Sequence, residues 1–334
     1  MGANYKTALC LTPDRAFFCQ AVCAAASVLA HGDAEQFDLF ILCEEQDVAP
    51  GFERLAPAIR GRITLKTLEF SKFDRGLAAR GRFSRAVFRR LFLDRVLPET
   101  YERIISLDSD VWIARPGLGR LAEINLGGAA LAAAYDMIFL MDFNGGALAK
   151  SFQRQRAGLG LSSETPYFNA GLMAIDRQRW AALAVGERAI EALLRRPQRY
   201  PFYEQSALNE FFAGAFAPLS PRYNFMGDFF LLDLEETIAP IVLHFVNSPK
   251  PWQYKLWRGE RRFAENYSAW FASSPWPELS CHDADLAPLA PRPRQSARRR
   301  AFAQRLLTFL GTRQFIDGWR PANWPRQAEQ STAR

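Results

Sequence analysis

The chain has 334 residues, of which 49% are hydrophobic and 23% are charged, and its formal net charge is +7. This composition excludes an intrinsically disordered protein and is ordinary for a folded α/β protein with one large domain and appendages. The positive charge lies at the end of the chain, because residues 292–334 carry ten arginines against Asp317 and Glu329, whereas residues 1–291 carry 32 basic and 33 acidic side chains. Nucleic acid is therefore not an expected partner.

Cysteine usage and hydropathy bear on the compartment. The five cysteines are irregularly spaced and form no C-x-x-C pair, so a disulfide framework is a poor interpretation and a reducing compartment is favoured. The first residues resemble neither a signal peptide nor a membrane anchor, and no later segment reaches the roughly 18 uncharged apolar residues that a transmembrane helix needs. We therefore expect a cytoplasmic protein, free or peripheral on a membrane.

The first hundred residues predict alternating strands and helices. Residues 5–11 form an apolar strand, a turn follows at 12–14, and an alanine-rich helix extends to Gly32. Two more strands are predicted at 37–43 and 63–68. Strands that alternate with helices indicate βαβ units and a mostly parallel sheet, so the fold class is α/β.

Further along the chain, an amphipathic helix is predicted at 85–96, where positions 87, 88, 91, 92 and 96 are apolar. Strands are expected at 103–107, 129–134, 172–175 and 241–243. The first of these runs directly into Asp108-Ser109-Asp110. In open α/β sheets ligands bind beyond the carboxyl ends of the strands, so Asp14 and Asp108 both lie where a ligand is expected.

The acidic pair Asp108 and Asp110 points to a cation. In an extended chain the two side chains project from the same face, where they would repel one another unless a divalent metal neutralised them. A structural turn is the plainer alternative. A third interpretation is a haloacid-dehalogenase-type phosphatase, in which Asp108 would be a nucleophile and Asp228 and Asp233 a later acidic motif.

Five segments resemble, in the same order, motifs of the family 8 glycosyltransferases, which are retaining enzymes of the GT-A fold. They are 104–113 (IISLDSDVWI), 167–180 (YFNAGLMAIDRQRW), 204–209 (EQSALN), 219–225 (LSPRYNF) and 244–252 (HFVNSPKPW). The resemblance implies a GT-A-like, Rossmann-type nucleotide-diphospho-sugar transferase fold with a mostly parallel central sheet. It also implies transfer of a hexose from UDP-galactose or UDP-glucose to a glycan or glycolipid such as bacterial lipopolysaccharide.

The same resemblance assigns the metal site. Asp108, Asp110 and His244 match the metal ligands, and one imidazole with two carboxylates suits Mn²⁺, with Mg²⁺ as an alternative. Of the three histidines in the sequence, only His244 lies within one of the matched motifs. Lys250 matches a residue that would neutralise the departing nucleotide diphosphate together with the metal. A non-catalytic nucleotide-sugar-binding protein that kept the fold is the non-enzyme alternative.

The remaining matched residues are expected around the donor and the reacting centre. Glu204 and Gln205 match the catalytic neighbourhood, although the family usually has aspartate at position 204 and glycine at position 247, where this chain has Asn247. The longer Glu204 side chain bears on which hexose is accepted, since galactose and glucose differ only at C4. The expected donor-binding residues, besides Asp108 and Lys250, are Thr12, Asp14, Arg90, Ser109, Asp136, Asn169, Ala170 and Gly171.

The sequence predicts that residues 276–334 lie outside the catalytic domain. We expect a catalytic domain over residues 1–275, a linker at 276–296 and a basic amphipathic tail at 297–334. In the tail, Phe302, Leu306, Phe309 and Leu310 recur at helical spacing beside several arginines, and two tryptophans follow. Such a helix is typical of one that lies on an anionic membrane, here the inner face of the cytoplasmic membrane. Packing of the same apolar stripe on the catalytic domain is the alternative.

Overall fold

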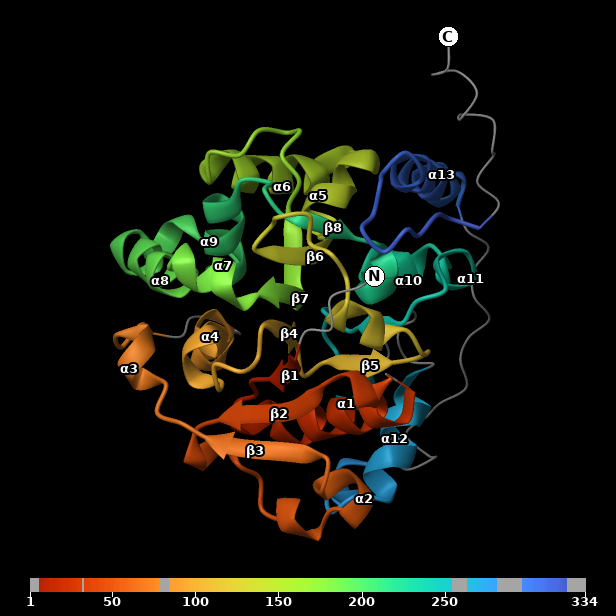
Figure 1. Ribbon diagram of the computed structural model, residues 1–334. Coiled ribbons are helices and arrows are strands. Elements are labelled where there is room, and N and C mark those ends of the chain that lie inside the picture. The colour runs from red at the N-terminus through yellow and green to blue at the C-terminus, as the bar shows by residue number, and fades with distance from the viewer. Residues whose placement is uncertain (1–5, 32, 79–83, 254–262, 281–295, 323–334) are drawn as a thin grey trace.

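The computed structural model describes residues 6–31, 33–78, 84–253, 263–280 and 296–322. A seven-stranded sheet in the order β3-β2-β1-β4-β7-β6-β8 forms its centre (Figure 1). Its strands are β1 (Thr7–Leu11), β2 (Asp38–Cys43), β3 (Ile63–Thr67), β4 (Arg103–Leu107), β6 (Leu131–Tyr135), β7 (Phe168–Asp176) and β8 (Ala217–Leu219).

The direction of the strands confirms the predicted α/β class with one exception. Strands β3, β2, β1 and β4 pair in parallel, as do β6 and β8. Strand β7 is antiparallel to both of its neighbours, β4 and β6. The central strands β1 and β4 are buried along their whole length, which explains why they read as continuous apolar runs rather than alternating ones.

A second, three-stranded sheet lies beside the first, in the order β5-β10-β9. Its strands are β5 (Val111–Ile113), β9 (Phe225–Met226) and β10 (Val242–His244). The chain leaves the large sheet at the end of β4 and enters the small one at β5, so residues 108–110 form the crossing between the two sheets. The β5–β10 register then pairs His244 with Val111, directly after this crossing.

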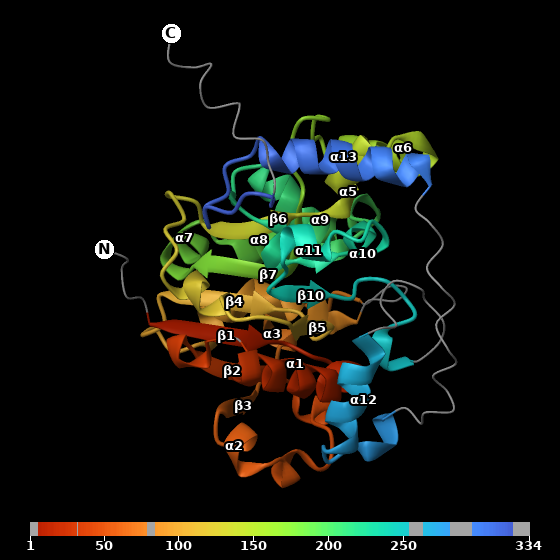
Figure 2. The same ribbon diagram turned by 90° about the vertical axis from the view of Figure 1, so that its right-hand side faces the viewer.

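Helices cover both faces of the sheets. In Figure 2, α12 lies beside α1 at the end of the molecule that carries β2 and β3, while α6 and α13 lie at the opposite end. The helices are α1 (Phe18–His31), α2 (Pro57–Arg60), α3 (Ser71–Asp74), α4 (Leu93–Val96), α5 (Met137–Leu140), α6 (Gly146–Gly158), α7 (Arg177–Ala182), α8 (Val185–Arg195), α9 (Tyr203–Phe212), α10 (Asp228–Leu231), α11 (Glu235–Ile238), α12 (Ala264–Ala272) and α13 (Ala297–Gly311).

Short 3₁₀ turns connect many of these elements. They are η1 (Arg15–Phe17), η2 (Ala34–Gln36), η3 (Glu45–Asp47), η4 (Phe52–Arg54), η5 (Arg85–Phe92), η6 (Leu118–Ala122), η7 (Met141–Phe143), η8 (Pro197–Arg199), η9 (Pro221–Tyr223), η10 (Pro251–Gln253) and η12 (Pro277–Leu279). The amphipathic helix predicted at 85–96 is a 3₁₀ helix, η5, followed by the single turn α4. The apolar face of η5 is buried, and so are Arg89 and Arg90 on its polar face. Because most of the helix surface is covered, the spacing of the apolar residues alone could not distinguish a 3₁₀ helix from an α-helix.

The C-terminal part packs on the domain. Residues 276–280, predicted as linker, include η12, and the buried indole of Trp276 donates a hydrogen bond to the carbonyl of Pro50 at 2.8 Å. The rest of the predicted linker, 281–295, and Trp324 lie outside the described residues. Helix α13 buries its apolar stripe, and the ring of Phe309 lies 4.4 Å from that of Phe143. Of the two alternatives for this stripe, the structure therefore shows packing on the domain that carries the strands.

Within the part of the chain that the structure describes, no helix combines the length and the apolar character that crossing a bilayer requires. The helix with the basic residues, α13, is bonded to the domain from its middle and from the segment that follows it. The guanidinium of Arg305 donates to the carbonyl of Phe143 at 2.6 Å, and the carboxylate of Asp317 accepts from the backbone N–H and hydroxyl of Ser220 at 3.0 and 2.7 Å. These contacts connect residues 305–317 to the domain that carries the strands.

Candidate active site

One cavity of about 740 Å³ lies where the carboxyl ends of β1 and β4 meet the small sheet. Every metal, donor-binding and catalytic residue that the family resemblance implies lines it, whereas Asp233 of the phosphatase interpretation does not. They are Thr12, Asp14, Arg90, Asp108, Ser109, Asp110, Asp136, Asn169, Ala170, Gly171, Glu204, Gln205, His244 and Lys250. The segments that carry them are far apart in sequence, and the sheet brings their ends together at one edge.

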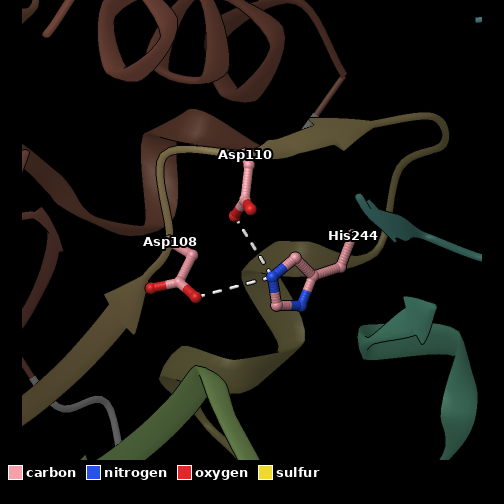
Figure 3. A group of neighbouring side chains, drawn as sticks. All are labelled: Asp108, Asp110 and His244. Atoms are coloured by element: carbon pink, nitrogen blue, oxygen red, sulfur yellow. Dashed lines mark ion pairs between the residues drawn. The ribbon is translucent and has the colours of Figure 1, made fainter. Parts of the chain in front are cut away.

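Asp108, Asp110 and His244 converge in this cavity (Figure 3). Nε2 of His244 lies 3.4 Å from Oδ2 of Asp108 and 3.2 Å from Oδ1 of Asp110, and one ligand atom of each residue lies within 4.8 Å of the other two. One imidazole nitrogen and two carboxylate oxygens facing a common point are a mixed N/O donor set. The residues present therefore fit a divalent cation.

Two cations hold the outer oxygens of the two aspartates. The Arg90 guanidinium donates to Oδ1 of Asp108 and, at 2.7 Å, to the carbonyl of Ala170. Nζ of Lys250 lies 2.6 Å from Oδ2 of Asp110. Each carboxylate therefore keeps its other oxygen directed at His244, which is the arrangement that a shared cation requires.

The electrostatics of the site favour a positive charge between the carboxylates. Burial alone would raise the pKa of Asp108, but the Arg90 guanidinium and the hydrogen bond with His244 hold this pKa below its usual value. Burial would also raise the pKa of Asp110, but the charges of Lys250 and His244 lower it below its usual value. Burial would lower the pKa of His244, yet the two carboxylates raise it to about 9. Nε2 thus carries a proton at neutral pH unless a cation replaces it.

A second group of polar side chains lies beside the cation site. Oδ2 of Asp136 accepts from Nδ2 of Asn169 at 2.6 Å and from Nε2 of Gln205 at 3.3 Å, and Oδ1 accepts from the backbone N–H of Ile138 at 2.7 Å. Oε1 of Gln205 accepts from the backbone N–H of Ala170 at 3.0 Å. These groups form one connected wall of hydrogen-bonding atoms in the cavity.

Glu204 is buried in this wall. Burial raises the pKa of its carboxyl to about 7, and the Arg90 guanidinium, with Nε 3.6 Å from Oε1 of Glu204, opposes that rise without cancelling it. The two acidic residues 108 and 204 thus share one arginine. The longer side chain at position 204 is engaged with Arg90 as well as lining the cavity.

The first loop supplies the opposite wall. Asp14 caps η1, because its Oδ1 accepts from the backbone N–H of Phe17 at 3.0 Å. Thr12, Asp14 and Ser109 are half-buried, and all three line the cavity. The turn-forming role of Asp14 and a position against a ligand are therefore compatible.

One buried residue at the site has no predicted role. Asn224 lies in the segment 219–225 that carries the resemblance, and its Oδ1 is 2.8 Å from Nδ1 of His244. The only signal in the sequence is that this asparagine belongs to one of the matched motifs.

Comparison with known proteins identifies the family. The sequence model of glycosyl transferase family 8 matches residues 7–255. The chain belongs to this family. This family 8 chain is therefore a glycosyltransferase, and the phosphatase interpretation of Asp108 is not supported. In the structure Asp108 is held by Arg90 and His244 at a candidate cation site.

Relatives of this family 8 glycosyltransferase include enzymes named for sugar transfer. Lipopolysaccharide 1,2-glucosyltransferase of Escherichia coli K12 is 24% identical over 242 residues, 69% of this chain and 67% of that protein. Probable galacturonosyltransferase-like 6 of Arabidopsis thaliana is 26% identical over 263 residues, 72% of this chain and 73% of that protein.

Among solved structures, the galactosyltransferase LgtC in complex with donor and acceptor sugar analogues aligns with a TM-score of 0.63. It is 21% identical, and the alignment covers 78% of this chain and 94% of LgtC. At this identity the likeness shows the GT-A fold, which confirms the predicted fold.

Proposed function

We propose that this glycosyltransferase moves a hexose from a UDP-sugar, UDP-galactose or UDP-glucose, to a glycan or glycolipid acceptor such as lipopolysaccharide, with retention of the anomeric configuration. The single observation that carries the proposal is the convergence of Asp108, Asp110 and His244 in a cavity that all the other matched residues line. The names of the relatives support sugar transfer to lipopolysaccharide as one such reaction.

The proposed chemistry is assisted departure of the nucleotide diphosphate. A divalent cation, manganese or magnesium, held by Asp108, Asp110 and His244 would supply positive charge at the diphosphate. Lys250, which already lies against Asp110, adds a second positive charge where negative charge develops as the glycosidic bond breaks. Arg90 orients Asp108 through its guanidinium and lies against Glu204. Thr12, Asp14 and Ser109 line the side proposed for the nucleotide.

The hydrogen-bonded wall is the proposed site for the hexose. Asp136, Asn169 and Gln205 present carboxylate and amide groups that can bond sugar hydroxyls, and the backbone at Ala170 and Gly171 lies against them. Gln205 is a neutral amide held by Ala170 and Asp136, and the carboxyl of Glu204 is held by Arg90. These restraints favour attack of the acceptor hydroxyl on the same face that UDP leaves, over a double displacement through a protein nucleophile.

Association with the inner face of the cytoplasmic membrane belongs to the proposal on the ground of charge. Residues 298–300 are three consecutive exposed arginines in the first turn of α13. Because the apolar stripe of α13 is covered by the domain, contact with anionic lipid would be electrostatic.

Calorimetric titration of UDP with and without Mn²⁺, together with turnover of both UDP-sugars, tests the function. The variant Asp110→Asn removes one charged ligand and is expected to lower kcat by about 100-fold or more, because several kcal/mol of charge stabilisation are lost. Glu53→Gln, an exposed carboxylate outside the cavity, is the matched control and should leave kcat unchanged. Wild-type turnover in Asp110→Asn, or an affinity for UDP that is the same with and without Mn²⁺, would contradict the metal assignment.

A further inference from the structure

The second nitrogen of the His244 ring has its own partner. Nδ1 of His244 lies 2.8 Å from Oδ1 of Asn224, and the two residues are 3% and 1% exposed. A ring nitrogen facing a carbonyl-type oxygen carries the hydrogen, which leaves Nε2 to face the aspartates. The orientation of the Asn224 amide therefore decides which nitrogen of His244 is available as a ligand.

That orientation follows from neighbours whose roles are unambiguous. Oδ1 of Asn169 accepts from the backbone N–H of Gly171 at 2.8 Å, and a backbone N–H can only donate. Nδ2 of Asn224 donates to the same oxygen of Asn169 at 2.8 Å, so Oδ1 of Asn224 must point to His244. The other end of the Asn169 amide donates to Asp136. A continuous line of hydrogen bonds thus runs from Asp136 through Asn169 and Asn224 to His244.

Gly171 makes room for the same ring. A Cβ atom added at Gly171 would lie 2.7 Å from Nδ1 of His244, closer still to Cε1, and 2.9 Å from Oδ1 of Asn169. The backbone of Gly171 lies in strand β7 and does not have the positive φ angle that requires glycine elsewhere in the chain. The requirement at position 171 is therefore one of space, because the imidazole rests against the backbone.

We propose that Asn224 and Gly171 are positioning residues for His244, an inference that rests on the proposed cation site. Asn224 holds the Nδ1–H tautomer and Gly171 seats the ring, so that Nε2 is directed at the point shared with Asp108 and Asp110. Neither residue touches the cation or the substrate through this role. The same line of hydrogen bonds joins the wall proposed for the hexose to the cation site.

The test is Mn²⁺ binding, measured on the full chain at saturating UDP by the electron paramagnetic resonance signal of free Mn²⁺. Loss of an outer partner of a ligating histidine typically weakens metal binding by about 10–100-fold, which we expect for Asn224→Leu and for Gly171→Ala. Asn224→Asp keeps the acceptor for Nδ1–H and should bind Mn²⁺ within about threefold of the wild type. Equal affinity of Asn224→Leu and the wild type would overturn the proposal.

Two controls separate positioning from general damage. Asn209→Leu removes another buried amide, one that bonds the backbone of Phe168 and the carbonyl of Gln205 but not His244. Gly119→Ala places a Cβ 2.7 Å from Cβ of Asp33, and neither residue lines the cavity. Both should lose stability and keep the wild-type Mn²⁺ affinity. A loss of affinity in these controls as large as in Asn224→Leu would also overturn the proposal.

A second measurement holds even if the leucine variant does not fold. In the wild type loaded with Mg²⁺ and UDP, the ¹⁵N and ¹H resonances of the imidazole report the tautomer of His244. Only three histidines occur in the sequence, so His31→Gln and His282→Gln assign the signal. The Nδ1–H tautomer is expected, and an Nε2–H tautomer would refute the role of Asn224. Wild-type protein that binds no Mn²⁺ at all would instead refute the proposed function.

Discussion

The proposed action of Lys250 on the leaving group agrees with the position of its ammonium, which is largely buried at the candidate cation site. Its Nζ contacts Asp110 at 2.6 Å and also the carbonyl of Phe245, and only 11% of its side chain is exposed. Removal of a surface lysine changes stability and activity little, whereas Lys250 balances the charge of the half-buried Asp110.

We expect Lys250→Ala to lower kcat by about 100-fold, since a preorganised charge at the developing anion is removed. Steady-state kinetics with UDP-galactose and UDP-glucose measure this effect. Lys72→Ala, a change at an exposed lysine paired with Glu69, should leave kcat as it is. If kcat of Lys250→Ala equals that of the wild type, Lys250 is a structural residue and the proposed mechanism loses its second positive charge.

Motif order was enough to collect the candidate side chains in one cavity, but not to indicate their partners. The pairing of Arg90 with Asp108 and Glu204 depends on how η5 packs against the end of β4, which sequence spacing does not specify. Asn224 was missed for a related reason. Its partner His244 is 20 residues away and comes within reach only through the pairing of β9 with β10.

Helix α13 closes the far end of the domain with aromatic contacts. The ring of Phe309 lies 5.9 Å from Tyr135, 5.8 Å from Phe139 and 4.4 Å from Phe143. Tyr135 and Phe139 flank the segment that carries Asp136. The helix therefore supports the back of the wall proposed for the hexose.

Phe309→Ala should reduce the free energy of unfolding by about 3 kcal/mol, because a buried ring is replaced by a cavity. Gln304→Ala, an exposed position on the same helix, should change it by less than about 0.5 kcal/mol. Urea denaturation followed by circular dichroism measures both values. Equal stabilities of the two variants would mean that α13 does not pack on the domain in solution.

The elements that sequence patterns predicted well are those with long apolar runs. Strands β1, β2, β3 and β4 begin and end within two residues of the expected positions wherever the structure describes them. The antiparallel direction of β7 could not be predicted, because side-chain alternation is the same in both directions. Strand β9 has only two residues, too few for any periodicity, and the packing of α13 could not be distinguished from membrane binding by an apolar stripe alone.

Over the whole molecule, charge is distributed unevenly between the domain and its last segment. Residues 292–334 hold ten of the chain's 42 basic side chains and only two of its 35 acidic ones. Because the apolar stripe of α13 is buried, this helix can contact a partner through the exposed arginines 298–300. Any attraction to an anionic surface should therefore respond to ionic strength.

We expect the protein to sediment with anionic phospholipid vesicles at about 0.1 M salt and to dissociate at about 1 M, where the Debye length falls to about 3 Å. Replacing Arg298, Arg299 and Arg300 by glutamine should remove about 1 kcal/mol per arginine, or more than 100-fold in binding overall. Vesicles of neutral lipid are the control. Binding that survives high salt would show that α13 leaves the domain and inserts, and no binding at low salt would rule out the membrane proposal.

The docking of α13 also sets an order for biosynthesis. Arg305 bonds the carbonyl of Phe143 across 162 residues of sequence. At ribosomal rates of about 5–20 residues per second, the aromatic surface around Phe143 waits roughly 10–30 s for the helix that covers it. During that interval the nascent chain exposes an apolar surface beside Asp136, formed by Tyr135, Phe139 and Phe143. This surface is one to which a chaperone could bind. A polypeptide released before residue 297 would lack Phe309 and leave the rings of Tyr135, Phe139 and Phe143 without this cover.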